Sequence, residues 1–114
     1  MSEATDGATH PAAALDEVVH QRARLGVLSI LAEAEDADFT YLRRTLGLTD
    51  GNLGRHLEVL VDASYVNLRK GYDGRRNRTW ASITPRGRQA LLAELTVLRA
   101  LVAQLDAGDE TTER

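Results

Sequence analysis

Apolar residues recur at intervals of three and four along most of the chain, the spacing that places them on one face of a helix. The first such stretch begins at residue 15, contains no proline, and has its apolar positions at Leu15, Val18, Val19, Leu25, Leu28 and Leu31. It fades in the acidic run of residues 33–38, which we interpret as a solvated loop and not as a metal site or a catalytic carboxylate pair. We therefore predict a first helix from Leu15 to this run.

Two shorter helices separated by a tight turn are predicted next. The first extends from residue 39 or 40 to residue 46, and Gly47 follows where a left-handed residue commonly ends a helix. The second starts at the N-cap candidate Thr49, reaches about residue 62, and places apolar side chains on one face at Leu53, Leu57 and Leu60. Two helices joined by a short turn that contains glycine are typical of a helix-turn-helix.

A hairpin and a long helix complete the predicted fold. Residues 65–70 and 78–83 alternate and favour strands, and the segment between them contains the strong turn former Asp73-Gly74. Thr84 and Pro85 are suited to begin the last helix. Its apolar positions, spaced 4-3-4-3, are Leu91, Leu95, Leu98, Val102 and Leu105.

The predicted fold class is therefore mainly α with a small β-hairpin (α+β), in the order helix, helix, helix, strand, strand, long C-terminal helix. A chain of 114 residues suits one domain. We assign residues 15–106 to this domain, residues 1–14 to a flexible N-terminal arm and residues 107–114 to a frayed tail.

Charge is distributed unevenly along the chain, whose net charge is −3. Residues 69–88 hold seven basic residues and one acidic residue, a net charge of +6, so the remainder carries −9. A concentrated basic segment on an acidic protein is typical of a phosphate-binding surface. The alternative is a basic hairpin that only meets water.

The second helix of the helix-turn-helix has a polar side suited to contacts with DNA, formed by Thr49, Asp50, Gly51, Asn52, Arg55 and His56. Asn and Arg side chains can pair with adenine and guanine edges in the major groove. Gly51 and Gly54 each cost about 1 kcal/mol of helix propensity, which favours close approach of a DNA backbone. An ordinary amphipathic helix whose polar face meets water is the alternative.

Arginines gather at the tip of the predicted hairpin, where the candidate contacts are Arg75, Arg76, Asn77 and Arg78. Side chains at such a tip are free to reach a minor groove or phosphates. Arg86 and Arg88 open the last helix, where a positive charge opposes the helix dipole unless an external anion lies nearby.

These stretches together resemble the winged helix-turn-helix DNA-binding domain of small transcriptional regulators related to the MarR and ArsR groups. The resemblance covers residues 15–101 and is carried by residues 39–43, 48–57, 74–79 and 83–88, most specifically by Leu48-Thr49-Asp50-Gly51-Asn52-Leu53. It implies a dimer whose two third helices enter successive major grooves while the hairpins, or wings, reach the flanking minor grooves. The last helix has neither cysteine nor histidine, so ArsR metal sites are not carried over, and no additional C-terminal helix completes a MarR-type ligand pocket.

The spacing of the last helix also predicts a homodimer, because Leu92 and Leu101 widen its apolar surface beyond what one partner helix would cover. We expect the first and last helices to form the interface, through Leu15, Val18, Val19, Leu91, Leu95, Leu98, Val102 and Leu105.

Several classes of protein are disfavoured by composition. Absence of cysteine excludes disulfides, thiolate nucleophiles and cysteine-bound zinc, and suits a reducing cytoplasm. No apolar stretch approaches the ~20 residues of a membrane span, and residues 1–10 lack the basic residues of a signal peptide. His10, His20 and His56 have no partners at motif spacing, so we expect no enzyme, no metal and no cofactor.

The sequence thus predicts a cytoplasmic, sequence-specific regulator of transcription that binds double-stranded DNA as a homodimer. Nothing in it supports a small-molecule effector, although none is excluded. The alternatives are a winged-helix module for protein–protein interaction and a nonspecific architectural DNA binder.

Overall fold

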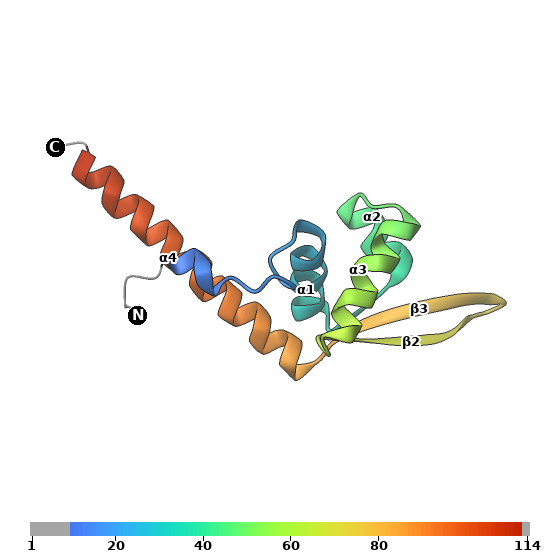
Figure 1. The fold of residues 1–114 in the computed structure, drawn as a ribbon. Helices are drawn as coiled ribbons and strands as arrows, with labels where there is room; N and C mark the ends of the chain where they lie inside the picture. Colours follow the sequence, from blue (N-terminus) through green and yellow to red (C-terminus); the bar gives the residue numbers. More distant parts are fainter. Residues whose placement is uncertain (1–9, 113–114) are drawn as a thin grey trace.

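A computed structural model describes residues 10–112 of the chain. Its elements, in order, are the 3-10 helix η2 (Pro11–Ala14), α1 (Arg22–Ala34), β1 (Asp36–Asp38), α2 (Phe39–Leu46), α3 (Asp50–Asp62), β2 (Val66–Asp73), β3 (Arg76–Ile83) and α4 (Pro85–Thr112) (Figure 1). The predicted fold class, a helical domain with a small antiparallel hairpin and a long C-terminal helix, is confirmed.

The hairpin of β2 and β3, called the wing below, is longer than the sequence predicted. Pairing continues to Asp73 opposite Arg76, so the loop shrinks from the expected seven residues to Gly74 and Arg75. Gly74 has a φ of +65°, and a positive φ at the first of two loop residues is the pattern of a type II′ turn. The wing therefore extends as a two-stranded ribbon from the helical body (Figure 1).

A third strand, β1, lies within the acidic run that we expected to be a loop. It pairs antiparallel with β3, with Ala37 opposite Ala81, and gives the sheet order β1-β3-β2. Both alanines are buried in the core. This pairing fixes the base of the wing to the segment that leads into α2.

The helix-turn-helix forms as its capping residues predict. Gly47 adopts a φ of +67° in the left-handed region and ends α2. The Thr49 hydroxyl then accepts the backbone N–H of Asn52 at 3.1 Å and begins α3. Leu53, Leu57 and Leu60 of α3 point into the core, as predicted.

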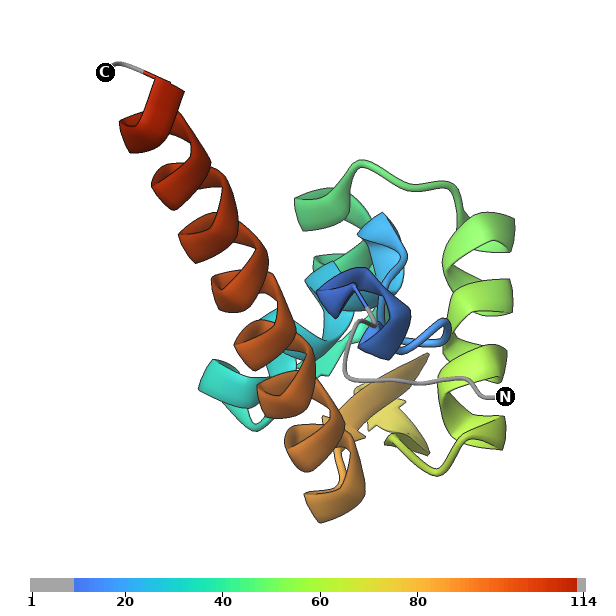
Figure 2. The same cartoon turned by 60° about the vertical axis from the view of Figure 1, so that its left-hand side comes forward.

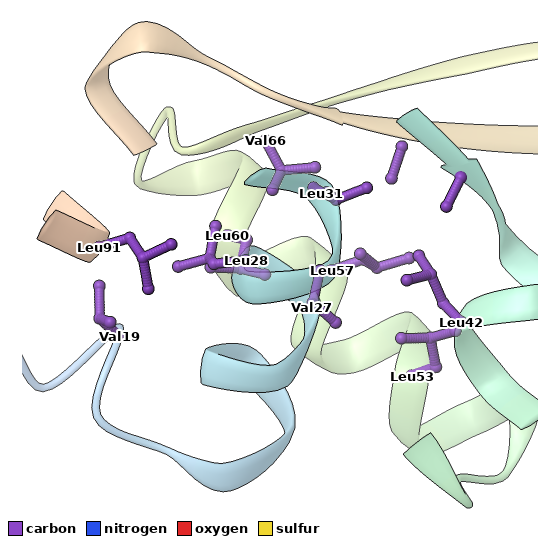
Figure 3. Close-up of a cluster of buried hydrophobic side chains, with 12 residues drawn as sticks. Val19, Val27, Leu28, Leu31, Leu42, Leu53, Leu57, Leu60, Val66 and Leu91 are labelled. Atoms are coloured by element: carbon purple, nitrogen blue, oxygen red, sulfur yellow. The ribbon is translucent and has the colours of Figure 1, made fainter. Parts of the chain in front are cut away.

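The core is aliphatic and draws on every helix from α1 to α4 and on all three strands (Figure 3). Its buried members are Val19, Val27, Leu28, Leu31, Ala37, Leu42, Leu53, Leu57, Leu60, Val66, Ala81 and Leu91. Full burial of one Leu or Val side chain contributes about 1.5–3 kcal/mol. This cluster therefore fixes α3 firmly against α1.

The first helix begins at Arg22, so the predicted start at Leu15 is wrong. The reason is local: Asp16 Oδ1 accepts the backbone N–H groups of Val18 at 2.8 Å and Val19 at 3.2 Å, which favours a turn over a helix. Upstream, η2 packs on α4, so the last residues of the expected arm are ordered (Figure 2). Residues 1–9 of that arm lie outside the described residues.

Helix α4 continues to Thr112, so residues 107–112 extend the helix where a frayed tail was expected. Its 28 residues span about 42 Å at 1.5 Å per residue. Figure 2 shows α4 and α3 on opposite sides of the domain, with η2 and α1 between them. The C-terminal half of α4 projects away from the body and makes the molecule elongated, 64 × 36 × 23 Å.

Candidate nucleic-acid interface

The polar side of α3 brings the predicted contact residues onto one surface. Thr49, Asp50, Gly51, Asn52 and Arg55 are exposed, and His56 lies partly buried at the edge facing α1. A Cβ added at Gly51 or Gly54 would meet no atom within 4 Å. Packing within the protein therefore does not require either glycine.

Two side chains on this surface are joined to each other. Arg55 donates from Nη2 to Oδ1 of Asn52 at 2.7 Å, across one turn of α3. Both remain exposed, so they present a single pre-arranged polar group to solvent.

His56 is held by Arg24 of α1, a residue that the sequence analysis did not identify. Arg24 Nη1 lies 3.1 Å from Nδ1 of His56, and its Nε donates to the carbonyl of Val18 at 2.6 Å. Burial, followed by the charges of Arg24 and Arg55, lowers the pKa of His56 from its usual 6.5. No sequence signal marked this residue, because the predicted start at Leu15 placed Arg24 inside the first helix.

Asp50 pairs with the preceding helix. Its Oδ1 lies 3.0 Å from Nε of Arg43 in α2. Asp50 also stands in the first turn of α3, where a negative charge is favourable. This exposed pair joins the two helices of the helix-turn-helix.

The arginines of the wing divide into two groups. Arg75 and Arg76 are exposed beside the turn, with Asn77 next to them. Arg78, by contrast, lies 2.7 Å from Asp38 and 3.1 Å from Asp73. The structure therefore ties Arg78 to β1 and to the opposite strand of the wing, where we had expected a side chain free at the tip.

A groove of about 610 Å³ separates α2 from β3. This basic groove is lined by Asp38, Phe39, Thr40, Arg43, Arg44, Arg76, Asn77, Arg78 and Thr79. It contains four arginines and one acidic residue, and it joins the helix-turn-helix to the wing. Sequence analysis missed Arg43 and Arg44, although two adjacent arginines on a short amphipathic helix could have indicated them.

Two other basic residues of the 69–88 segment make contacts within the protein. Arg69 stacks on Trp80, with its guanidinium carbon 4.5 Å from the ring centroid. Arg88 donates to the carbonyl of Ala32, in the last turn of α1, at 3.2 Å. The external anion expected beside Arg88 is thus not needed to explain its position.

The expected dimer residues do not all lie on a free surface. Val19 and Leu91 belong to the core of the protomer, so their assignment to the interface is wrong. On the outer half of α4, Val102 is 58% exposed and Leu105 is 72% exposed. Beside them lies an apolar groove of about 360 Å³, lined by Leu95, Leu98, Arg99, Val102, Ala103 and Asp106.

Neither a metal site nor a membrane span is found in the described part of the chain. Among the side chains that the structure describes, no three His, Asp or Glu are grouped so that they could hold a metal ion. None of the helices in this part of the chain has the length and apolarity to cross a membrane.

Fold and surface together define a winged-helix domain of the kind found in DNA-binding transcriptional regulators. Residues 23–102 match the family described as the winged helix DNA-binding domain, so the chain belongs to that family, which is not a known enzyme family.

Similar proteins come from archaea and bacteria. An uncharacterised protein of Methanocaldococcus jannaschii is 39% identical over 67 residues, 59% of this chain and 73% of that protein. The structure of a transcriptional regulator homologue from Pyrococcus horikoshii is 31% identical, with a TM-score of 0.74, covering 80% of this chain and 90% of that one. The M. tuberculosis regulator MosR, solved in complex with DNA, has the same fold at 22% identity, with a TM-score of 0.63 and coverage of 79% and 64%.

Other structures with this fold include a MarR-family regulator from Silicibacter pomeroyi and a possible regulator of arsenical resistance. The resemblance to the MarR and ArsR groups is therefore confirmed at the level of the fold.

Proposed function

We propose that this protein is a transcriptional regulator that binds a specific double-stranded DNA sequence as a homodimer, in the cytoplasm. Helix α3 enters the major groove, and the tip of the wing contacts the minor groove and its phosphates. The observation that carries the proposal is that the helix-turn-helix bears both the exposed Asn52–Arg55 pair on α3 and, on α2, one wall of a basic groove that the wing completes.

The arrangement of charge supports contact with a duplex. The basic groove lies between α2 and the wing, and its four arginines are suited to bind the phosphates of a sugar–phosphate strand. The domain also shares its fold with MosR, which was solved with DNA.

Exposed apolar residues on α4 support the homodimer. Val102 and Leu105 lie beside the apolar groove, on the part of α4 that projects beyond the body. A second copy of α4 would cover them and set two α3 helices about one two-fold axis. Two-fold symmetry then predicts a palindromic operator with half-sites about 10 bp apart.

Selection from a randomised duplex library, at low and high salt, tests the proposal. We expect a palindromic motif that persists at the higher salt. Uniform binding that collapses with salt would indicate a nonspecific architectural protein, and no binding would favour a protein-interaction module.

Single substitutions separate the two kinds of contact. Arg55→Ala and Asn52→Ala should relax the sequence preference, whereas Arg75→Ala and Arg76→Ala should weaken binding to all sequences and reduce its salt dependence. All four residues are exposed, so the fold should survive each change. Unchanged affinity in all four variants would refute this assignment of the site.

A further inference from the structure

Two arginines fix the hydrogen-bonding groups that α3 presents to solvent. Arg55 Nη2 lies 2.7 Å from Oδ1 of Asn52, and Arg24 Nη1 lies 3.1 Å from Nδ1 of His56. A guanidinium can only donate hydrogen bonds. The atom of Asn52 that faces Arg55 must therefore be its oxygen, and the ring nitrogen of His56 that faces Arg24 must be the unprotonated one.

Asn52 and His56 therefore each keep free hydrogen-bond donors. Asn52 retains the two N–H bonds of Nδ2, and the neutral ring of His56 carries its proton on Nε2. An amino group that approached the Asn52 oxygen would also come beside the Arg55 cation, which would repel it. The bidentate contact with adenine, in which Asn accepts from N6 and donates to N7, is therefore disfavoured.

Two acceptors elsewhere on this end of α3 also take part in contacts within the protein. The Thr49 hydroxyl accepts the backbone N–H of Asn52 at 3.1 Å. The carboxylate of Asp50 lies 3.0 Å from Arg43. The surface that faces a major groove thus offers donors from Asn52, Arg55 and His56.

Guanine complements such a surface best, because its major-groove edge carries two acceptors, N7 and O6, whereas thymine carries one, O4, and adenine and cytosine each present an amino donor. We propose that α3 selects guanine, and that each half-site carries a guanine contacted through N7 and O6 by the Asn52–Arg55 pair. This inference rests on the proposed function, in which α3 enters the major groove.

Selected sequences test the two proposals separately. Enriched half-sites that contain a guanine at one fixed position support the inference. Enriched half-sites of A·T pairs alone would overturn it and leave the DNA-binding function intact, whereas no enrichment would count against that function itself.

Base analogues then identify the contacted atom. Replacing the selected guanine by 7-deazaguanine removes the N7 acceptor and should weaken binding about five- to hundredfold, the range of a specific base contact. The same analogue outside the half-site is the control and should have less than about a twofold effect. Equal effects at both positions would overturn the proposal.

A substitution in the protein tests the same contact between Asn52 and guanine. Asn52→Asp replaces the donors with acceptors of similar shape and should abolish the preference for guanine over adenine at that position. Asn67→Asp, at an exposed position in β2, makes the same change of charge away from α3 and should retain the preference. A preference kept by both variants would contradict the assignment.

Arg24 is a positioning residue in this scheme, and the pH profile of DNA binding tests it. The charged groups that face His56 are Arg24 from α1 and Arg55 from α3 itself. In Arg24→Met the ring loses its fixed tautomer and a neighbouring cation, so affinity should increase as pH falls from 8 to 6. Arg24→Lys should restore the flat profile of the parent protein, and identical profiles in all three proteins would overturn this role.

Discussion

Arg78 of the wing lies 2.7 Å from the carboxylate of Asp38, the residue that caps α2. The other oxygen of the same carboxylate accepts the backbone N–H of Tyr41 at 2.8 Å. One side chain therefore contacts both the start of the helix-turn-helix and the strand β3 of the wing.

Asp38→Asn should separate the two roles of that carboxylate. Asparagine remains a good N-cap, so stability should change little, but the basic groove loses its negative charge and DNA affinity at low salt should increase. Asp38→Ala also removes the cap and should cost about 1 kcal/mol more in unfolding free energy. Urea denaturation and fluorescence anisotropy measure the two effects; weaker DNA binding by Asp38→Asn would contradict the expectation.

Alanine at Gly51 or Gly54 should stabilise the protein and impair its function. Each substitution should raise the free energy of unfolding by up to about 1 kcal/mol, because the added methyl group meets open space. The same methyl group would meet an approaching DNA backbone and weaken binding. Gly108→Ala, at an exposed position on α4, is the matched control and should leave DNA affinity unchanged.

Glu94 should prove important for stability, because its side chain is buried and accepts hydrogen bonds from two directions. Its oxygens lie 2.9 Å from the backbone nitrogen of Asp16 and 2.7 Å from Nδ1 of His20. Glu94→Ala leaves the amide of Asp16 without this acceptor and should cost about 1–3 kcal/mol in urea denaturation. Glu94→Gln should cost less, and His20→Ala the least, since that imidazole is half exposed; the reverse order would contradict this account.

Charge placed on the outer half of α4 should separate the protomers. Val102→Glu buries an uncompensated carboxylate in the proposed interface and should produce a monomer in analytical ultracentrifugation. The protomer should stay folded, because this side chain is 58% exposed within it. Glu58→Gln, an exposed change of charge on α3, serves as a control for oligomeric state, and a Val102→Glu protein that remained dimeric would exclude this surface.

The pKa of His56 should affect stability at mildly acidic pH. Because that pKa is lowered in the folded state, the unfolded chain binds the proton first as pH falls below about 6.5. The contribution of neutral His56 to the free energy of unfolding is therefore complete above pH 6.5 and is lost as pH falls through the folded-state pKa. Urea denaturation from pH 8 to 5 should show a weaker pH dependence for His56→Gln than for the parent protein, and equal dependence would refute the assignment.

Local chemistry explains which parts of the fold were predictable. The caps at Gly47 and Thr49 act within a few residues, so the helix-turn-helix followed from the sequence. Strand β1 did not, because its Asp-Ala-Asp sequence has little strand propensity and pairs through the burial of Ala37 against β3. The start of α1 was missed because the Asp16 side chain binds backbone N–H groups that a helix would use.

The candidate site residues also divide into those that the sequence could predict and those that it could not. The exposure of Asn52 and Arg55 followed from helical periodicity, since both lie opposite the apolar face of α3. The position of Arg24 against His56 depends on how α1 packs on α3, which periodicity does not specify. Periodicity also cannot distinguish an apolar side chain in the protomer's own core from one in an interface, and Leu91 was misassigned for that reason.

Gly87, near the start of α4, lies so close to the loop before β2 that a Cβ there would overlap the carbonyl oxygen of Tyr65. The long helix thus rests on the backbone at the end of the α3–β2 corner, with no side chain between them. A side chain at residue 87 would push α4 away from this corner. In the dimer proposed above, such a shift would change the separation of the two α3 helices, so a residue remote from the DNA would alter the spacing at which two half-sites are bound.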